Sequence, residues 1–166
     1  MSVGRGTTGR MADADATMST AADGLVRLVD QAAAALRRLD EAGVSAKPSR
    51  DVWSVKEIVG HLVDSAANNH HRFVRAQQGR GLAFPGYDQN AWVRVQDHQS
   101  RSWLELLDLW VLYNRHLAHA IRRIPNAALG VPCAIGAGEP VTLRFLVEDY
   151  VRHLSHHLRQ IQDRLA

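Results

Sequence analysis

Apolar residues recur at steps of three and four along most of the chain, which is the period of one face of an α-helix. The first such stripe predicts an amphipathic helix over about residues 20–42 that ends at Gly43. Residues 1–18 show no apolar period and are rich in glycine, threonine and alanine. We therefore expect a flexible N-terminal tail over residues 1–18, followed by one folded domain over residues 19–166.

Two segments carry the S-x-x-E pattern of a capping box, in which serine covers a backbone N–H and glutamate reaches back to the cap. The segment Ser54–Glu57 predicts the start of a second long helix, which runs to about residue 78. The segment Ser102–Glu105 predicts the start of a third, which runs to about residue 124. This third helix is apolar around most of its circumference. It is therefore either buried on two sides or offers one side to a second subunit.

The rest of the chain supplies one more long helix. Thr142 can cap an amphipathic helix that runs through Leu165, and a short helix is expected over about residues 89–98. Residues 79–88 and 125–140 are rich in glycine and proline and lack periodicity, so we expect long loops there. No segment shows the alternation of a β-strand convincingly. The predicted fold class is all-α, a four-helix bundle with a short extra helix and long loops.

Composition narrows the class of protein. The hydrophobic share of 46% is enough for a real core and argues against disorder. The single cysteine, Cys133, excludes a disulfide scaffold. No apolar run approaches the roughly 20 residues that span a bilayer, and no signal-peptide pattern opens the chain. We expect a cytoplasmic protein without a membrane partner.

The charged residues do not indicate a nucleic-acid partner. The formal net charge is +3, and arginine supplies all basic residues except Lys47 and Lys56. These arginines are scattered among aspartates and glutamates, whereas phosphate binding requires a clustered basic surface. The nine histidines are the stronger lead.

Three histidines have the spacing of a metal site. His153 and His157 are four residues apart, so both lie at the edge of the apolar stripe of the last helix. His61 has the same relation to the stripe of the second helix. Three protein ligands with one open position are typical of a catalytic metal site. The spacing alone is also compatible with histidines that are only hydrogen-bonded, and we interpret the other six histidines as structural or exposed.

Three further residues are candidates near this site. Asp64 and Asp149 lie about one turn from His61 and His153, so either carboxylate can accept the second N–H of a metal-bound histidine. Carboxylates on a helix are, however, more commonly exposed to solvent than bonded to a metal-bound histidine. Tyr150 can contact a substrate or simply pack in the core. Cys133 lies in a predicted loop, and neither chemistry considered below requires it.

Three stretches of the chain resemble the DinB-like (DinB/YfiT) superfamily of metal-binding four-helix bundles. The resemblance covers about residues 20–166. The stretches are residues 48–62, with W-S-V-K-E-I before His61; Y-D-Q-N-A-W at residues 87–92; and D-Y-V-R-H-L-S-H-H-L-R-Q-I at residues 149–161. The resemblance implies a divalent-metal site made of His61, His153 and His157, with zinc or nickel as the first candidates and iron, manganese or cobalt as others.

The resemblance also implies an architecture and a set of activities. Such bundles often run up-down-down-up and are frequently homodimers. Characterised members transfer an electrophilic group to a low-molecular-weight thiol such as bacillithiol or mycothiol, or isomerise with the help of a thiol. We therefore expect a metal-dependent enzyme that activates a small thiol for S-transfer to a small-molecule substrate. The alternatives are a metal-dependent hydrolase that uses metal-bound hydroxide, and a non-enzymatic metal- or ligand-binding stress-response bundle.

Overall fold

The protein is described by a computed structural model over residues 7–165, with side chains described from residue 18 onward. Four long helices form a bundle, and their bounds are α1 Thr7–Leu36, α3 Val55–Ala76, α5 Trp103–Arg122 and α6 Leu143–Leu165. Two short helices, α2 Glu41–Ser45 and α4 Gln89–Gln96, lie in the connections. Short 3₁₀ turns occupy residues 98–100 and 126–128.

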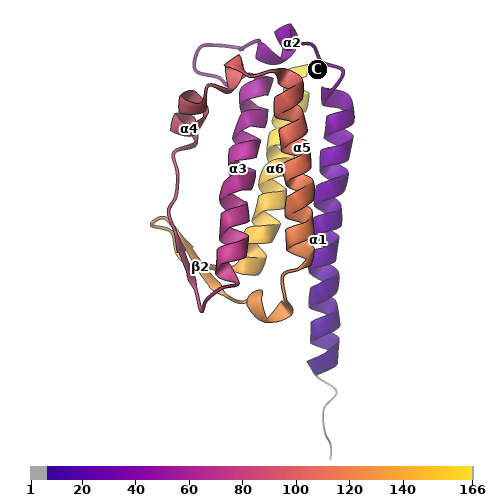
Figure 1. The fold of residues 1–166 in the computed structure, drawn as a ribbon, viewed down its shortest axis with the longest axis vertical. Coiled ribbons are helices and arrows are strands. Elements are labelled where there is room, and N and C mark those ends of the chain that lie inside the picture. Colours follow the sequence, from indigo (N-terminus) through magenta and orange to yellow (C-terminus); the bar gives the residue numbers. More distant parts are fainter. Residues whose placement is uncertain (1–6, 166) are drawn as a thin grey trace, which may run out of the picture.

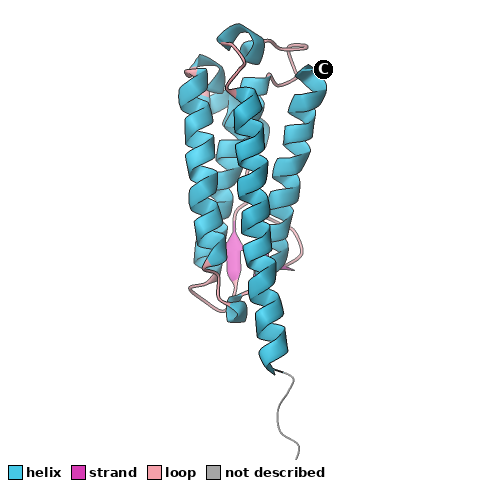
Figure 2. Cartoon of the chain, turned by 90° about the vertical axis from the view of Figure 1, so that its right-hand side faces the viewer, coloured by secondary structure: helices cyan, strands magenta, loops and turns pink. Residues whose placement is uncertain are grey.

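The bundle runs up-down-down-up, as expected. In Figure 1, α1 and α6 ascend while α3 and α5 descend, and Figure 2 shows the same four helices side by side from another direction. Around the bundle the order is α1, α5, α3, α6, so α3 packs against α6. The connection from α3 to α5 must therefore climb the whole length of the bundle. This long connection leaves one face of the α3–α6 pair next to loop segments.

The apolar stripes of the four long helices meet in one core. Each helix contributes fully buried side chains. Phe73 of α3 packs edge to face against Tyr150 of α6, with the ring centroids 6.0 Å apart. The buried stripe of α3 includes Val55, Ile58, Val59, Leu62, Ala66 and Phe73. Burial of these stripes, rather than helix propensity, stabilises the bundle.

The first helix is longer at its start than predicted. The predicted flexible tail covers residues 1–18, of which residues 1–6 lie outside the described part of the chain. From Thr7 the chain is already helical, and Met18 is buried in the core. The alanines of residues 12–16 have high helix propensity, so the helix extends into a segment that lacks an apolar period. The helix start predicted at about residue 20 was therefore wrong, because α1 begins at Thr7.

The same helix ends earlier than predicted, at Leu36 instead of Gly43. Asp40 caps the separate short helix α2, because its side chain accepts the backbone N–H of Gly43 at 2.7 Å. Gly43 therefore lies inside a helix and does not end one.

A small sheet lies beside the lower part of the bundle in Figure 1, next to α3 and α6, where only loops were predicted. Its strands are β1 Leu82–Phe84, β2 Pro132–Ile135 and β3 Val141–Thr142. β1 pairs with β2 in parallel and β2 pairs with β3 antiparallel, so the two long connections are joined. Strands of two to four residues are too short to show an alternating pattern. Within residues 7–165, no helix combines the length and apolarity needed to cross a membrane.

Candidate metal centre

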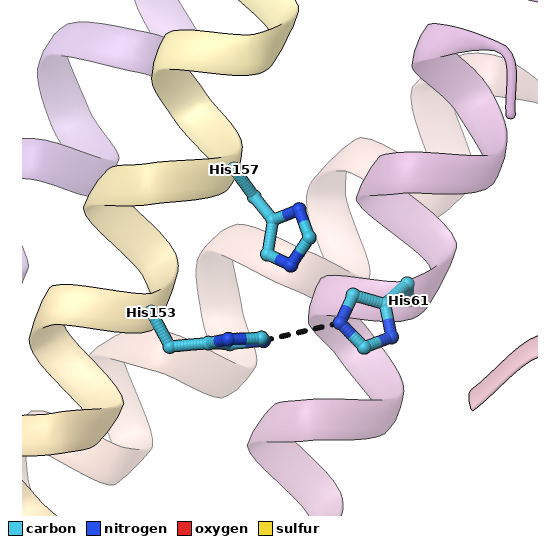
Figure 3. Close-up of side chains that lie close together, drawn as sticks. All are labelled: His61, His153 and His157. Carbon is cyan, nitrogen blue, oxygen red and sulfur yellow. Dashed lines mark hydrogen bonds between the residues drawn. The ribbon is translucent and has the colours of Figure 1, made fainter. Parts of the chain in front are cut away.

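His61, His153 and His157 lie together between α3 and α6. One ring nitrogen from each of the three lies within 4.8 Å of the others. Figure 3 shows His61 projecting from α3 toward the two histidines of α6, which lie one turn apart. The ring centroids of His61 and His157 are 4.7 Å apart, and those of His153 and His157 are 4.5 Å apart. The packing of α3 against α6 therefore brings together residues that are 92 positions apart in the chain.

The donor set fits a divalent metal ion. The Nε2 atoms of His61 and His153 are 3.1 Å apart. Two nitrogens that each lie about 2.0–2.1 Å from a zinc ion at tetrahedral angles are about 3.3 Å apart. Imidazole nitrogen suits zinc, nickel, copper and iron better than it suits magnesium or calcium. The spacing and the atom type agree with a three-histidine metal centre.

Burial keeps the three imidazoles neutral. Burial, followed by the charges of His157 and His153, lowers the pKa of His61 to about 3. Burial and then His153 lower the pKa of His157 to about 4. Burial also lowers the pKa of His153, against the opposing charge of Asp149. Since metal binding requires the unprotonated form, the ring nitrogens are available to a metal at neutral pH.

His157 is oriented by a residue that the sequence analysis did not assign. The Nδ1–H of His157 donates to Oε1 of Gln160 at 2.8 Å, which leaves Nε2 free to face the cluster. The amide nitrogen of Gln160 donates in turn to Nε2 of His156 at 3.0 Å. Gln160 lies three residues after His157 on the same helix, and this spacing is a usable signal for such a partner. The ring of Trp53 lies 5.1 Å from that of His61 and covers it from the loop before α3.

The two carboxylates predicted as partners of the histidines form their hydrogen bonds with other residues. The carboxylate of Asp64 accepts the amide of Gln96 at 2.7 Å and contacts the His98 ring at 3.3 Å. Asp64 therefore connects α3 to the end of α4 and the turn that follows it. Nδ1 of His61 has no hydrogen-bond partner among the described residues. Asp149 accepts from Arg152 at 3.1 Å. Neither carboxylate is hydrogen-bonded to the cluster in the described part of the chain.

Tyr150 is a core residue that also borders the site. Its hydroxyl donates to Oδ1 of Asn114 at 2.5 Å, and burial raises the pKa of Tyr150. The side chain is 2% exposed, so most of its surface packs against other residues. A direct role in substrate contact stays a prediction. Cys133 is buried in β2, where its thiol contacts the backbone oxygen of Val131.

A groove of about 220 Å³ opens beside the histidines, between α3 and α6. Tyr87 and Gln89, from the long connection between α3 and α5, also line it. The residues that line it are His61, Ser65, Asn69, Arg72, Tyr87, Gln89, Leu146, Asp149, Tyr150 and His153. A small molecule in this groove would lie against two of the three clustered histidines.

Fold and cluster together define a class: four-helix bundles that gather three histidines from two facing helices. A model of the DinB superfamily matches residues 12–161, so the chain belongs to the DinB superfamily. Among solved structures it is similar to YfiT from Bacillus subtilis, described as "a probable metal-dependent hydrolase with an unusual four-helix bundle topology". That match has a TM-score of 0.77 and 19% identity, and it covers 98% of this chain and 88% of YfiT. No curated protein matches the sequence.

Proposed function

We propose that this protein is a metal-dependent enzyme that activates a small thiol for transfer to an electrophilic substrate. The observation that carries the proposal is the cluster of three neutral histidines at the edge of a groove. A zinc or nickel ion bound by His61, His153 and His157 would supply Lewis acidity that favours the ionised form of a nucleophile in the open position. Gln160 holds the His157 ring, and Trp53 shields His61 from solvent.

The side chains around the groove favour a thiol over water. A bound metal ion would lower the pKa of either nucleophile. A free thiol begins at a pKa of about 8.5 and free water at about 15.7, so the thiol needs the smaller shift to ionise at neutral pH. Asp149 is the carboxylate that lines the groove within the described residues, and it already accepts a hydrogen bond from Arg152. A thiol loses its proton more easily, and its sulfur then forms the new bond to the substrate carbon as the leaving group departs.

Hydrolysis is the second candidate, because the similar YfiT structure carries the description of a probable metal-dependent hydrolase. One experiment separates the two. Zinc- or nickel-loaded protein is assayed with bacillithiol, mycothiol and glutathione against electrophilic acceptors and ester substrates, with and without thiol. Thiol-dependent turnover that His153→Ala abolishes supports the proposal. Turnover that needs no thiol, and that the same variant abolishes, favours the hydrolase.

We further propose that the chain forms a homodimer. The outer face of α5 carries Leu104, Leu109 and Leu112, which are 52%, 37% and 63% exposed. Leu109 and Leu112 are three positions apart and so are neighbours on the helix surface. Exposed apolar side chains that lie together are typical of an interaction surface. Sedimentation at micromolar concentration is expected to show a dimer that Leu112→Glu converts to a monomer. A wild-type protein that sediments only as a monomer would refute the proposal.

A further inference from the structure

Four polar residues follow one face of α3 away from the metal centre. They are spaced by four, four and three positions, the period at which side chains of a helix line up. In chain order they are His61, Ser65, Asn69 and Arg72, and all four line the groove. The groove therefore begins at the histidine cluster and extends along α3 to an arginine.

Arg72 has no acidic partner in the described part of the chain. None of the ion pairs found there includes it, and its buried Nε–H has no acceptor there. The side chain is only partly exposed, and burial lowers the pKa of Arg72. A guanidinium nevertheless stays charged in proteins. The nearby charge of Asp149 favours this charged form, but no carboxylate of the described residues forms an ion pair with the partly desolvated cation.

Neighbouring residues hold the guanidinium in place without neutralising it. Nη1 of Arg72 donates to Oδ1 of Asn69 at 3.4 Å, and the amide nitrogen of Asn69 donates to the backbone oxygen of Ser65 at 2.9 Å. The guanidinium carbon lies 5.7 Å from the ring centroid of Phe84 in β1. Asp149 lines the same groove, but its carboxylate accepts from Arg152.

We propose that Arg72 forms an anion-binding subsite that receives a carboxylate of the substrate, with Asn69 as its positioning residue. The planar fork of an arginine side chain matches a carboxylate through two parallel hydrogen bonds. This subsite rests on the proposed function, because it assigns the groove to the molecule that reacts at the histidine cluster. The substrate that fits both the histidine cluster and Arg72 is an elongated carboxylic acid.

The helix geometry sets the length of that substrate. His61 and Arg72 are eleven positions apart, which corresponds to about 16 Å along the axis of α3. Helical side chains lean toward the N-terminus, so the guanidinium approaches the cluster and the remaining span is roughly 10 Å or more. The reacting atom and the carboxylate must therefore lie at opposite ends of the substrate.

The binding of four probe molecules distinguishes recognition by Arg72 from recognition by the histidine cluster. They are ω-mercaptooctanoate, ω-mercaptooctanamide, octanoate and octanamide, and their affinities for zinc-loaded protein are measured by calorimetry. The acid-over-amide preference reports on Arg72, since only the acid carries charge. The preference for the thiol over its thiol-free counterpart reports on the histidine cluster.

The variants are Arg72→Gln and, as a matched control, Arg75→Gln. Arg75 lies on the same helix, is exposed and does not line the groove, so its replacement removes the same charge. Wild type and Arg75→Gln are expected to bind each acid about ten- to hundredfold more tightly than its amide, and Arg72→Gln is expected to lose this preference. Arg72→Lys keeps the charge without the fork and should retain part of it.

Each outcome decides the subsite independently of the chemistry at the cluster. An acid preference that survives in Arg72→Gln, or that is missing in wild type, overturns the subsite even when the thiol probes bind tightly. Loss of the thiol preference alone overturns the thiol proposal and leaves the subsite standing. A lower melting temperature of Arg72→Gln with an unchanged acid preference would show that Arg72 only packs against Phe84. Zinc content and circular dichroism confirm that the variants are folded.

Discussion

Gly60 precedes His61 and lies against the buried ring of His98. A Cβ at this position would overlap the Cβ, Cγ and Cδ2 atoms of His98, which also contacts Asp64. These atoms lie next to the backbone of His98, so a change of side-chain rotamer cannot move all of them away. We expect Gly60→Ala to lower the free energy of unfolding by about 1–3 kcal/mol, measured by urea denaturation.

Gly24 of α1 provides the control for this prediction. The nearest atom to a Cβ there is the end of Arg27, at 3.9 Å. Gly24→Ala is therefore expected to stabilise the protein by about 0.5–1 kcal/mol through helix propensity. Equal effects of the two substitutions would show that the contact between Gly60 and His98 is not tight.

Gln160 is expected to matter for metal affinity although it does not face the metal. Gln160→Leu removes the acceptor that fixes the Nδ1–H of His157, so the ring loses its orientation. Loss of such a partner typically lowers metal affinity by about 10- to 100-fold. The measurement is a zinc competition titration, with the exposed Gln162→Leu as control. Unchanged affinity in Gln160→Leu would contradict the proposed orientation of His157.

At the level of single residues, the sequence predicted the grouping of the three histidines better than it predicted their surroundings. His61, His153 and His157 follow helix periods that the apolar stripes define, so their convergence required only that two helices pack. Asp64 lies about one helical turn from His61, yet it contacts His98. His98 belongs to a separate turn, so the helical period of α3 could not predict this contact. The partners of a polar side chain depend on rotamers and on loops, which periodicity does not specify.

Among the elements, the start of α3 carries the clearest capping signal. The Ser54 side chain accepts from the Glu57 backbone at 3.1 Å, and Glu57 accepts from the Ser54 backbone at 2.8 Å. Ser54→Ala removes this cap, so we expect a loss of about 0.5–2 kcal/mol in the free energy of unfolding. Thermal and urea denaturation measure it.

The second S-x-x-E segment is the natural comparison. Ser102 makes no side-chain cap, and the backbone N–H of Trp103 donates instead to Oε2 of Glu41 at 3.1 Å. Ser102→Ala is expected to change stability by less than about 0.5 kcal/mol. Equal losses in the free energy of unfolding for Ser54→Ala and Ser102→Ala would contradict the conclusion that only Ser54 caps its helix.

These two segments show how far the elements could be predicted. Both predicted helices exist, and α3 and α5 begin where the pattern places them. The prediction of a second capping box was wrong, because Glu41, distant in the sequence, accepts the backbone N–H of Trp103 at the start of α5. The sheet could not be predicted for a similar reason: β1 and β2 pair across about fifty residues, and each strand is too short to carry a pattern.

In the whole molecule, the buried histidines make the metal-free bundle sensitive to acid. In the unfolded chain histidine has a pKa of about 6.5, whereas in the fold the pKa of His61 is about 3 and that of His157 about 4. Below about pH 6.5 the unfolded chain therefore binds protons that the folded site does not. The free energy of unfolding must fall as the pH drops through this range.

Urea denaturation of metal-free protein at about pH 7 and about pH 5 tests this dependence. His61→Asn removes one buried titrating group, so its stability is expected to fall less between the two pH values than that of wild type. His119→Asn, at an exposed position of α5, is the control and should behave like wild type. Equal losses in wild type and His61→Asn would contradict the burial of a neutral imidazole.

We propose that His61, His153 and His157 together hold one divalent metal ion in this member of the DinB superfamily. The most direct measurement is elemental analysis of untagged protein beside the triple variant in which all three histidines are alanine. A second triple variant, with the exposed residues His71, His116 and His119 changed to alanine, controls for surface binding. We expect about one zinc or nickel ion per chain in wild type and in the surface variant, and none in the cluster variant. Equal metal content in wild type and the cluster variant would contradict it.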